Sequence, residues 1–122
     1  MVKQTAGRDA LTGFADDFAR YNDDVLFGEV WNNPNISLHN RSMITISCLV
    51  GKGIVDDSLK YHITTAKKNG VTKEEMASML THLSFYAGWP NAWAALKMAR
   101  EVYKDGGSHG GMFGLGSFNE AY

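Results

Sequence analysis

The sequence predicts an all-α domain of five helices with a central helical hairpin. Apolar residues recur at three- and four-residue spacing along most of the 122 residues, a pattern typical of amphipathic helices. A helix stop is followed at once by a helix start in the middle of the chain, at residues 69–76. The β-branched run Ile44-Thr45-Ile46 has no second strand candidate with which to pair. These three observations together favour helices throughout.

The central hairpin is predicted between Asp56 and Pro90. Gly70 can take the left-handed conformation that closes a helix at little steric cost, and a new helix starts directly after it. Two start signals have the right spacing: a capping box in Thr72 with Glu75, and a hydrophobic staple in Val71 with Met76. The two helices must therefore turn back on each other at this point.

Two helices are predicted before the hairpin. The first is expected as one amphipathic helix from Asp9 to about Phe27, followed by a turn at 32–35. Its apolar positions are Phe14, Phe18, Tyr21 and Val25. The second is expected from a cap at Ser37 to about Gly51. Because residues 43–50 are apolar nearly all round, we expect this second helix to be central.

The last helix is predicted to begin at Pro90, since proline fits a first helical turn, and to run to about Lys104. Gly88 ends the helix before it. Residues 106–122 are rich in glycine but carry apolar anchors, so we expect either a strap that docks on a neighbouring subunit or a loose end. The chain is thus expected to divide into an all-α domain at 1–105 and a glycine-rich tail at 106–122.

Composition argues against several classes of function. The formal net charge is −1, so there is no basic excess to bind nucleic acid. No stretch approaches the ~20 apolar residues of a membrane helix, and the polar N-terminus is not a signal peptide. The single cysteine, Cys48, allows no internal disulfide and suits a reducing cytoplasm. We expect its apolar helix to make Cys48 structural and unreactive.

Two histidines, His62 and His82, lie on or beside the apolar faces of the hairpin helices and are the first candidates for chemistry. They belong to no H-E-x-x-H or Cys/His cluster, so no metal site is expected. Imidazole titrates near pH 6.5, which suits general acid or base catalysis at neutral pH. The alternative for His62, which has Leu59 and Ile63 beside it, is a structural role in the core.

Arg41 and Tyr86 are the supporting candidates. Arg41 lies at the start of the second helix, where a cation opposes the helix dipole, so we expect an anion nearby. Two interpretations stay open. The anion is part of a substrate, or it is a carboxylate of Asp56, Asp57 or Glu29 in an internal salt bridge.

Four stretches of the chain resemble the carboxymuconolactone decarboxylase family. They are Gly-Glu-Val-Trp-Asn-Asn-Pro at 28–34 with Arg-Ser-Met-Ile-Thr-Ile at 41–46, His62 with Ala66, Asn-Gly-Val-Thr-Lys-Glu-Glu at 69–75, and Tyr-Ala-Gly-Trp-Pro-Asn-Ala at 86–92. Their order and spacing are specific to the family, and the match spans about residues 14–103. The resemblance implies an all-helical subunit that assembles into a ring-forming homo-oligomer, a trimer or a hexamer, with the site near the hairpin.

The wider superfamily includes alkylhydroperoxidase D-like proteins, which carry a C-x-x-C pair just before the matching histidine. Here those positions are Val55 and Ser58. The resemblance therefore implies no dithiol peroxidase chemistry, because one thiol cannot form the internal disulfide that the cycle requires.

The family's named reaction converts 4-carboxymuconolactone to its enol-lactone in aromatic catabolism. The resemblance implies a carboxy-lyase of this kind that takes a small anionic substrate and needs no cofactor, because the substrate is its own electron sink. Such a site needs a cation for a carboxylate, a donor for the developing oxyanion and an acid. We assign the acid to His62, the oxyanion donor to Tyr86 or His82, and substrate binding to Arg41, Trp31 and Trp89.

Two other functions stay open. His82 stands where the decarboxylases more often carry glutamine, and this change is compatible with an alkylhydroperoxidase D-like oxidoreductase or peroxidase-related stress protein that lacks the dithiol. The other function is a non-enzymatic oligomeric scaffold, in which His62 is structural and no cavity reaches it.

Overall fold

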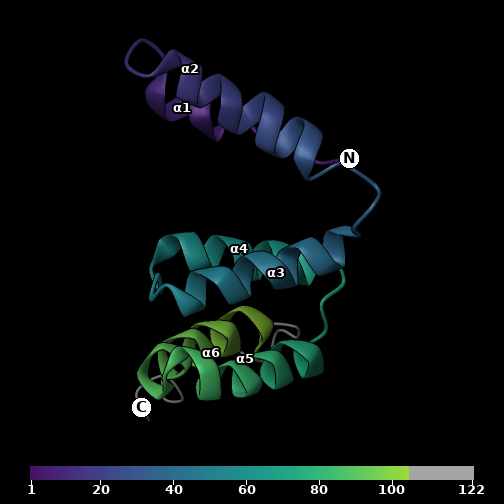
Figure 1. The fold of residues 1–122 in the computed structure, drawn as a ribbon, viewed down its shortest axis with the longest axis vertical. Coiled ribbons are helices and arrows are strands. Elements are labelled where there is room, and N and C mark those ends of the chain that lie inside the picture. The colour runs from purple at the N-terminus through teal and green to yellow at the C-terminus, as the bar shows by residue number, and fades with distance from the viewer. Residues whose placement is uncertain (105–122) are drawn as a thin grey trace. The chain divides into compact units, whose positions relative to one another are not determined.

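The structure is a computed structural model that describes residues 1–104, so the tail predicted at 106–122 lies outside the described residues. All regular elements of the described part are helices, which confirms the all-α class (Figure 1). None of these helices is both long enough and apolar enough to cross a membrane. The chain divides into two compact units, Met1–Arg41 (unit 1) and the residues from Ser42 onward (unit 2).

Unit 1 is a hairpin in which α1 (Ala6–Leu11) packs against α2 (Asp16–Arg20) and the π-helix η1 (Tyr21–Val30). The prediction of one continuous helix over 9–27 is therefore wrong. The break falls at Gly13, whose φ of 86° is a left-handed conformation that glycine adopts without strain. The local apolar spacing could not reveal this break, because the spacing continues on both sides of it.

The apolar face that was predicted for this first helix is not buried within the chain. Its members are all exposed: Phe14, Phe18, Tyr21 and Val25. A contiguous apolar face on the outside of a unit is typical of a surface that contacts another protein surface. The spacing thus identified the face, but not what covers it.

A buried carboxylate, Asp23, holds unit 1 together. It accepts hydrogen bonds from the backbone N–H groups of Gly7 at 2.8 Å and Arg8 at 3.0 Å. Burial by itself would raise the pKa of Asp23. The opposite effect is larger: the carboxylate accepts hydrogen bonds from Asn22 and from these two N–H groups and lies near the charge of Arg8, so its pKa is held below the ordinary value. A Cβ at Gly7 would lie 2.7 Å from Asp23 Oδ1, so the close approach requires glycine.

Unit 2 contains α3 (Leu38–Gly51) from Ser42 onward, α4 (Asp57–Lys68), α5 (Lys73–Ala87) and α6 (Trp89–Lys104). In Figure 1, α3 and α4 lie on one side of the α5–α6 pair. The helices share one apolar core, whose buried members are Ile46, Val50, Leu59, Ile63, Ala66, Val71, Met76, Leu80, Ala95 and Ala99. Each helix thus contributes one stripe to a common interior.

The turn at the centre of the predicted hairpin is confirmed. Gly70 has a φ of 93°. Thr72 Oγ1 accepts from the Glu75 N–H at 3.0 Å, and Glu75 Oε1 accepts from the Thr72 N–H at 2.9 Å, so both halves of the capping box form. Val71 and Met76 are both buried, as a hydrophobic staple requires. The closest neighbour of both hairpin helices, however, is α6, which packs antiparallel to α5 and also against α4.

The other predicted boundaries also hold. Ser37 Oγ accepts from the Asn40 N–H at 3.1 Å ahead of α3. Gly88, with a φ of 97°, ends α5, and Pro90 lies in the first turn of α6. Helix α6 continues to Lys104, the last residue that the structure describes.

Helix α3 does not lie at the centre of unit 2. It buries only one stripe, Ser42 with Ile46 and Val50, whereas Ile44 is 56% exposed and Cys48 is also exposed. The expectations of a central helix and of a shielded cysteine are therefore wrong for this chain. A helix at the edge of a bundle covers one face only, and apolar residues on its other faces stay on the surface.

Candidate active site

His62 lies on α4, beside the helix face that forms the core. That face consists of Leu59, Ile63 and Ala66, all of them fully buried. The imidazole is half-buried, and its Nδ1 atom is shielded from solvent. The ring of Tyr61 meets it edge to face, with ring centroids 5.0 Å apart. His62 therefore lies at the margin of the core, as its position in the sequence predicted.

Burial lowers the pKa of His62 from the value of 6.5 that an exposed imidazole has. The free ring is therefore mostly neutral at pH 7. A bound carboxylate would act in the opposite direction, because a nearby negative charge stabilises the imidazolium form. His62 is thus suited to gain a proton when an anionic substrate binds and to donate it afterwards.

His62 faces away from α6. The α4 residues that line hollows beside α6 are Lys60, Thr64, Lys67 and Lys68. Residue 62 follows Lys60 by two positions, which is about 200° around a helix axis. None of the four hollows that we describe along α6 is lined by His62. Within residues 1–104 these four hollows therefore do not reach His62, which is what the scaffold alternative also predicts.

His82 and Tyr86 form a pair on the exposed side of α5. Their ring centroids lie 5.1 Å apart, as expected for residues four apart on a helix. Tyr86 is 80% exposed and His82 is exposed, whereas Leu80 and Ser84 on the other side of the helix are buried. The structure thus brings these two predicted residues together, but on the side of α5 that faces away from the core.

Large aromatic side chains are exposed where α5 meets α6. The rings of Phe85 and Trp89 meet edge to face at 6.0 Å, and these residues are 77% and 57% exposed. Trp89 and Trp93 border a shallow hollow of about 200 Å³. Trp89, a predicted substrate contact, is therefore accessible, and it belongs to an apolar surface of the kind that marks interaction sites.

Arg41 uses part of its guanidinium to hold the turn that precedes α3. Its Nε donates to the carbonyl oxygen of Ile36 at 3.2 Å, and its Nη2 donates to that of Asn33 at 3.0 Å. Within unit 1 these carbonyls, and not the carboxylate of Glu29, are its partners. A guanidinium carries five N–H donors, so donors remain for a substrate carboxylate.

Trp31, the third predicted substrate contact, is buried within unit 1. Its ring stacks on that of Phe27, with centroids 5.9 Å apart and planes 17° from parallel. In unit 1 the indole therefore contributes mainly to packing.

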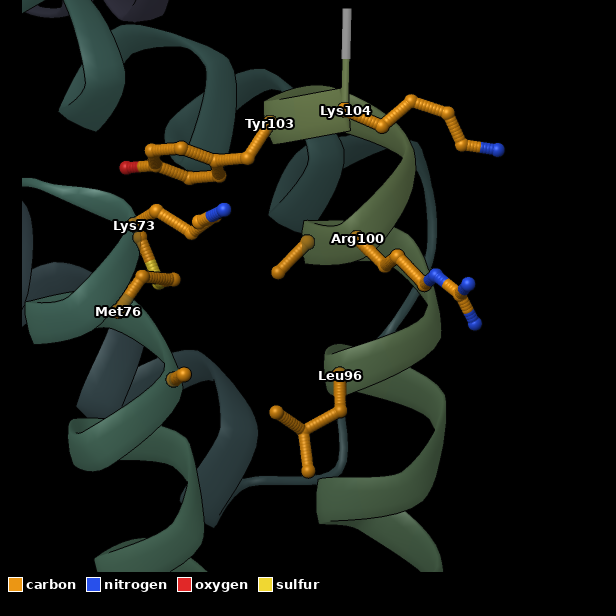
Figure 2. A pocket seen from close by; sticks show the side chains of 8 residues that line it. Lys73, Met76, Leu96, Arg100, Tyr103 and Lys104 are labelled. Atoms are coloured by element: carbon orange, nitrogen blue, oxygen red, sulfur yellow. The ribbon is translucent and has the colours of Figure 1, made fainter. Parts of the chain in front are cut away.

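Sequence reasoning missed a hollow of about 370 Å³ between the start of α5 and the end of α6 (Figure 2). Its lining residues are Lys73, Met76, Ala77, Leu96, Ala99, Arg100, Tyr103 and Lys104. They repeat at three- and four-residue spacing along each helix, and this signal was present in the sequence. Nothing local shows that the two rows face each other.

Neither a metal ligand set nor a dithiol is found in residues 1–104. No group of three or more histidine, cysteine, aspartate or glutamate side chains could share a metal ion there. Of the two positions that match the C-x-x-C pair, Val55 packs against the core, and Ser58 lies in the first turn of α4, where its N–H donates to Asp56 Oδ1 at 2.9 Å. Val55 therefore has a packing role, and the Ser58 position contributes its backbone N–H to the start of α4.

Comparison with known proteins decides the family. Residues 16–101 match the carboxymuconolactone decarboxylase family. The chain belongs to this family. It is 41% identical over 95 residues to the 4-carboxymuconolactone decarboxylase of Acinetobacter baylyi, an alignment that covers 78% of this chain and 70% of that protein.

Two more distant relatives match shorter segments. The nitrosuccinic acid decarboxylase npaB of Metarhizium robertsii is 28% identical over 79 residues, which cover 65% of this chain and 54% of that protein. An uncharacterized 15.0 kDa protein of Paracoccus denitrificans is 26% identical over 83 residues, 67% of this chain and 62% of its own length. The segment matched by the carboxymuconolactone decarboxylase family contains all the predicted site residues: Trp31, Arg41, His62, His82, Tyr86 and Trp89.

Proposed function

We propose that the protein is a cofactor-independent decarboxylase that acts on 4-carboxymuconolactone or a related small unsaturated lactone or acid. The observation that carries the proposal is the 41% identity to a 4-carboxymuconolactone decarboxylase. A second relative is named as a decarboxylase of a different acid, so the family resemblance supports the type of reaction more strongly than the substrate. The single cysteine suggests a reducing compartment, and we place the protein in the cytoplasm.

In the proposed reaction the bond between the ring carbon and its carboxylate breaks, and CO₂ leaves. The electron pair of that bond moves through the alkene into the lactone carbonyl and forms a dienolate. A proton delivered to the carbon next to the carbonyl then yields the enol-lactone. We assign this proton to His62, which afterwards regains one from water.

The other roles follow from the charges that the reaction develops. Arg41 binds a substrate carboxylate with the N–H donors that the turn leaves available. Tyr86 or His82 donates to the developing oxyanion. Trp89, whose ring is exposed, would form an apolar wall beside it, whereas Trp31 is buried in unit 1 and is given no direct contact with the substrate. The alternative role of His62 in the core is compatible with its half-buried position, and so it requires the mutational test described below.

We further propose that the active enzyme is a homo-oligomer, a trimer or a hexamer, in which one subunit's His62 meets the His82–Tyr86 pair of a neighbour. The pair lies on the outside of α5, beside the exposed rings of Phe85 and Trp89. A second copy that covers this surface would bury apolar area and also add an oxyanion donor to the site.

Subunit mixing tests this shared site. A His62→Gln variant and a His82→Ala, Tyr86→Phe double variant are each expected to be nearly inactive. After joint refolding, random assembly should restore up to about a quarter of wild-type activity, because that fraction of shared sites is intact. No recovery, with assembly demonstrated by light scattering, would show that each site lies within one chain.

The pH dependence of turnover tests the role of His62 as acid. Because burial lowers the pKa of His62, the imidazolium of the free enzyme loses its proton as the pH rises, and it does so at a pH below 6.5. Values of kcat/KM should therefore fall tenfold per pH unit above pH 6.5. The fall in kcat should come at higher pH, because the bound carboxylate raises the pKa of the ring. A kcat/KM that is constant from pH 5.5 to 8 would contradict the assignment.

The direct test of function is an assay of the full chain with 4-carboxymuconolactone, in which loss of substrate and release of CO₂ are both measured. Equal amounts of CO₂ and enol-lactone are expected. The competing oxidoreductase function predicts consumption of a hydroperoxide that survives Cys48→Ser, together with no lactone turnover.

A further inference from the structure

The hollow between α5 and α6 has the features of a ligand site (Figure 2). Its floor is apolar, since Met76 is fully buried and Ala99 is nearly so. Leu96 and the ring of Tyr103 form its walls. A volume of about 370 Å³ lies within the range of small-molecule pockets, which often form between the helices of a bundle.

Lys73 supplies a positive charge to this apolar hollow. Its side chain extends from the first residue of α5 toward α6, below the ring of Tyr103 (Figure 2). Within residues 1–104 its ammonium group forms no ion pair. Arg100 and Lys104 also line the hollow, although their head groups point away from α5, and none of the carboxylates in residues 1–104 lines it.

Helix stability does not explain the position of Lys73. Arg100 and Lys104 lie near the end of α6, where cations complement the negative end of the helix dipole. Lys73, by contrast, is the first residue of α5, where the dipole disfavours a cation. Glu74 and Glu75 share this first turn, and their carboxylates offset the positive helix end, so the charge of Lys73 itself is what would stabilise an anion at the mouth of the hollow.

The hydroxyl of Tyr103 takes no part in this site. It donates to the carbonyl oxygen of Val71 at 2.7 Å. Burial and the charge of Glu75 raise the pKa of Tyr103, so the hydroxyl keeps its proton. Tyr103 therefore presents its ring, and not its oxygen, to the hollow, which leaves Lys73 as the polar group that would orient a ligand.

We propose that this hollow binds a small monocarboxylate with a compact apolar body, such as an arylcarboxylate. The carboxylate would pair with Lys73, and the body would lie on Met76 and Ala99, between Leu96 and the ring of Tyr103. No α4 residue lines the hollow, and His62 faces the side of α4 away from α6. The site is thus separate from the proposed catalytic histidine and does not depend on the proposed function.

The test measures binding of 2-naphthoate and of its uncharged analogue 2-naphthamide to the full chain by titration calorimetry. Lys73→Met should weaken naphthoate binding at least ~10-fold and leave naphthamide binding almost unchanged, because only the carboxylate pairs with the ammonium group. Lys60→Met is the matched control, because it removes one lysine beside a different hollow, and it should change the binding of neither naphthoate nor naphthamide.

A second variant tests the hollow itself. Ala77 is exposed on the folded chain and lines the hollow, so Ala77→Phe should fill it without disturbing the core and abolish binding of both compounds. Lactone turnover should stay at the wild-type level in Lys73→Met and in Ala77→Phe. The proposal is overturned if naphthoate does not bind at millimolar concentration, if Lys60→Met weakens binding as much as Lys73→Met, or if turnover falls together with binding.

Discussion

His62→Gln is expected to lower the turnover of 4-carboxymuconolactone at least ~10²-fold, the usual effect of removing a general acid. Glutamine keeps a polar side chain at the half-buried position but cannot hold a proton that titrates near neutral pH. The loss should fall on kcat, because proton delivery contributes in the transition state and not to substrate binding. Steady-state kinetics at pH 6.5 and 8 give both parameters.

The matched control is His39→Gln, at a histidine on α3 that has no assigned role. It should leave kcat unchanged. Circular dichroism and light scattering of both variants should match those of the wild-type protein, so that an activity difference reflects chemistry and not folding. Turnover that survives His62→Gln would remove the proton donor from the mechanism and favour the structural interpretation of this residue.

Leu80→Ala is expected to lower the free energy of unfolding by about 2–5 kcal/mol, the range for truncating a fully buried leucine. Leu80 is 0% exposed, and it belongs to the one apolar core to which α3, α4, α5 and α6 all contribute. The loss has two parts, the lost burial of the removed atoms and the cavity that remains. Urea denaturation followed by circular dichroism measures it.

Leu26→Ala is the control, because it removes the same atoms from a leucine that is 41% exposed. Its effect should stay below about 1 kcal/mol, as for most surface substitutions. Protein concentration must be held constant, since assembly of copies would add to the measured stability. A smaller loss for Leu80→Ala than for Leu26→Ala would mean that the core is not where the structure places it.

The helix boundaries of unit 2 were predictable because each depends on residues only a few positions apart. Gly70 takes a positive φ, Thr72 and Glu75 close a capping box, and Gly88 ends α5 just before Pro90. Signals of this range need no knowledge of the rest of the fold. The contact between His82 and Tyr86 was predictable for the same reason, since residues four apart are neighbours on any helix.

The spacing of apolar residues was a less reliable guide to which neighbour packs against a helix face. It predicted one helix over 9–27, but a left-handed Gly13 breaks that segment. It placed α3 at the centre, yet Ile44 and Cys48 lie on the surface of the chain. Spacing identifies which side chains share a helix face. It does not identify the partner of that face.

Short stretches of sequence thus determined the helical class, most helix ends in unit 2 and the position of His62 at the margin of the core. They could do so because caps, left-handed glycines and side-chain periodicity act within a few residues. Packing between distant segments was needed for the rest. It made α6 the common neighbour of α4 and α5, set His82 and Tyr86 on an outer surface, and aimed Lys73 into an apolar hollow. These features depend on which helix faces meet, and that choice is distributed over many weak contacts far apart in the sequence.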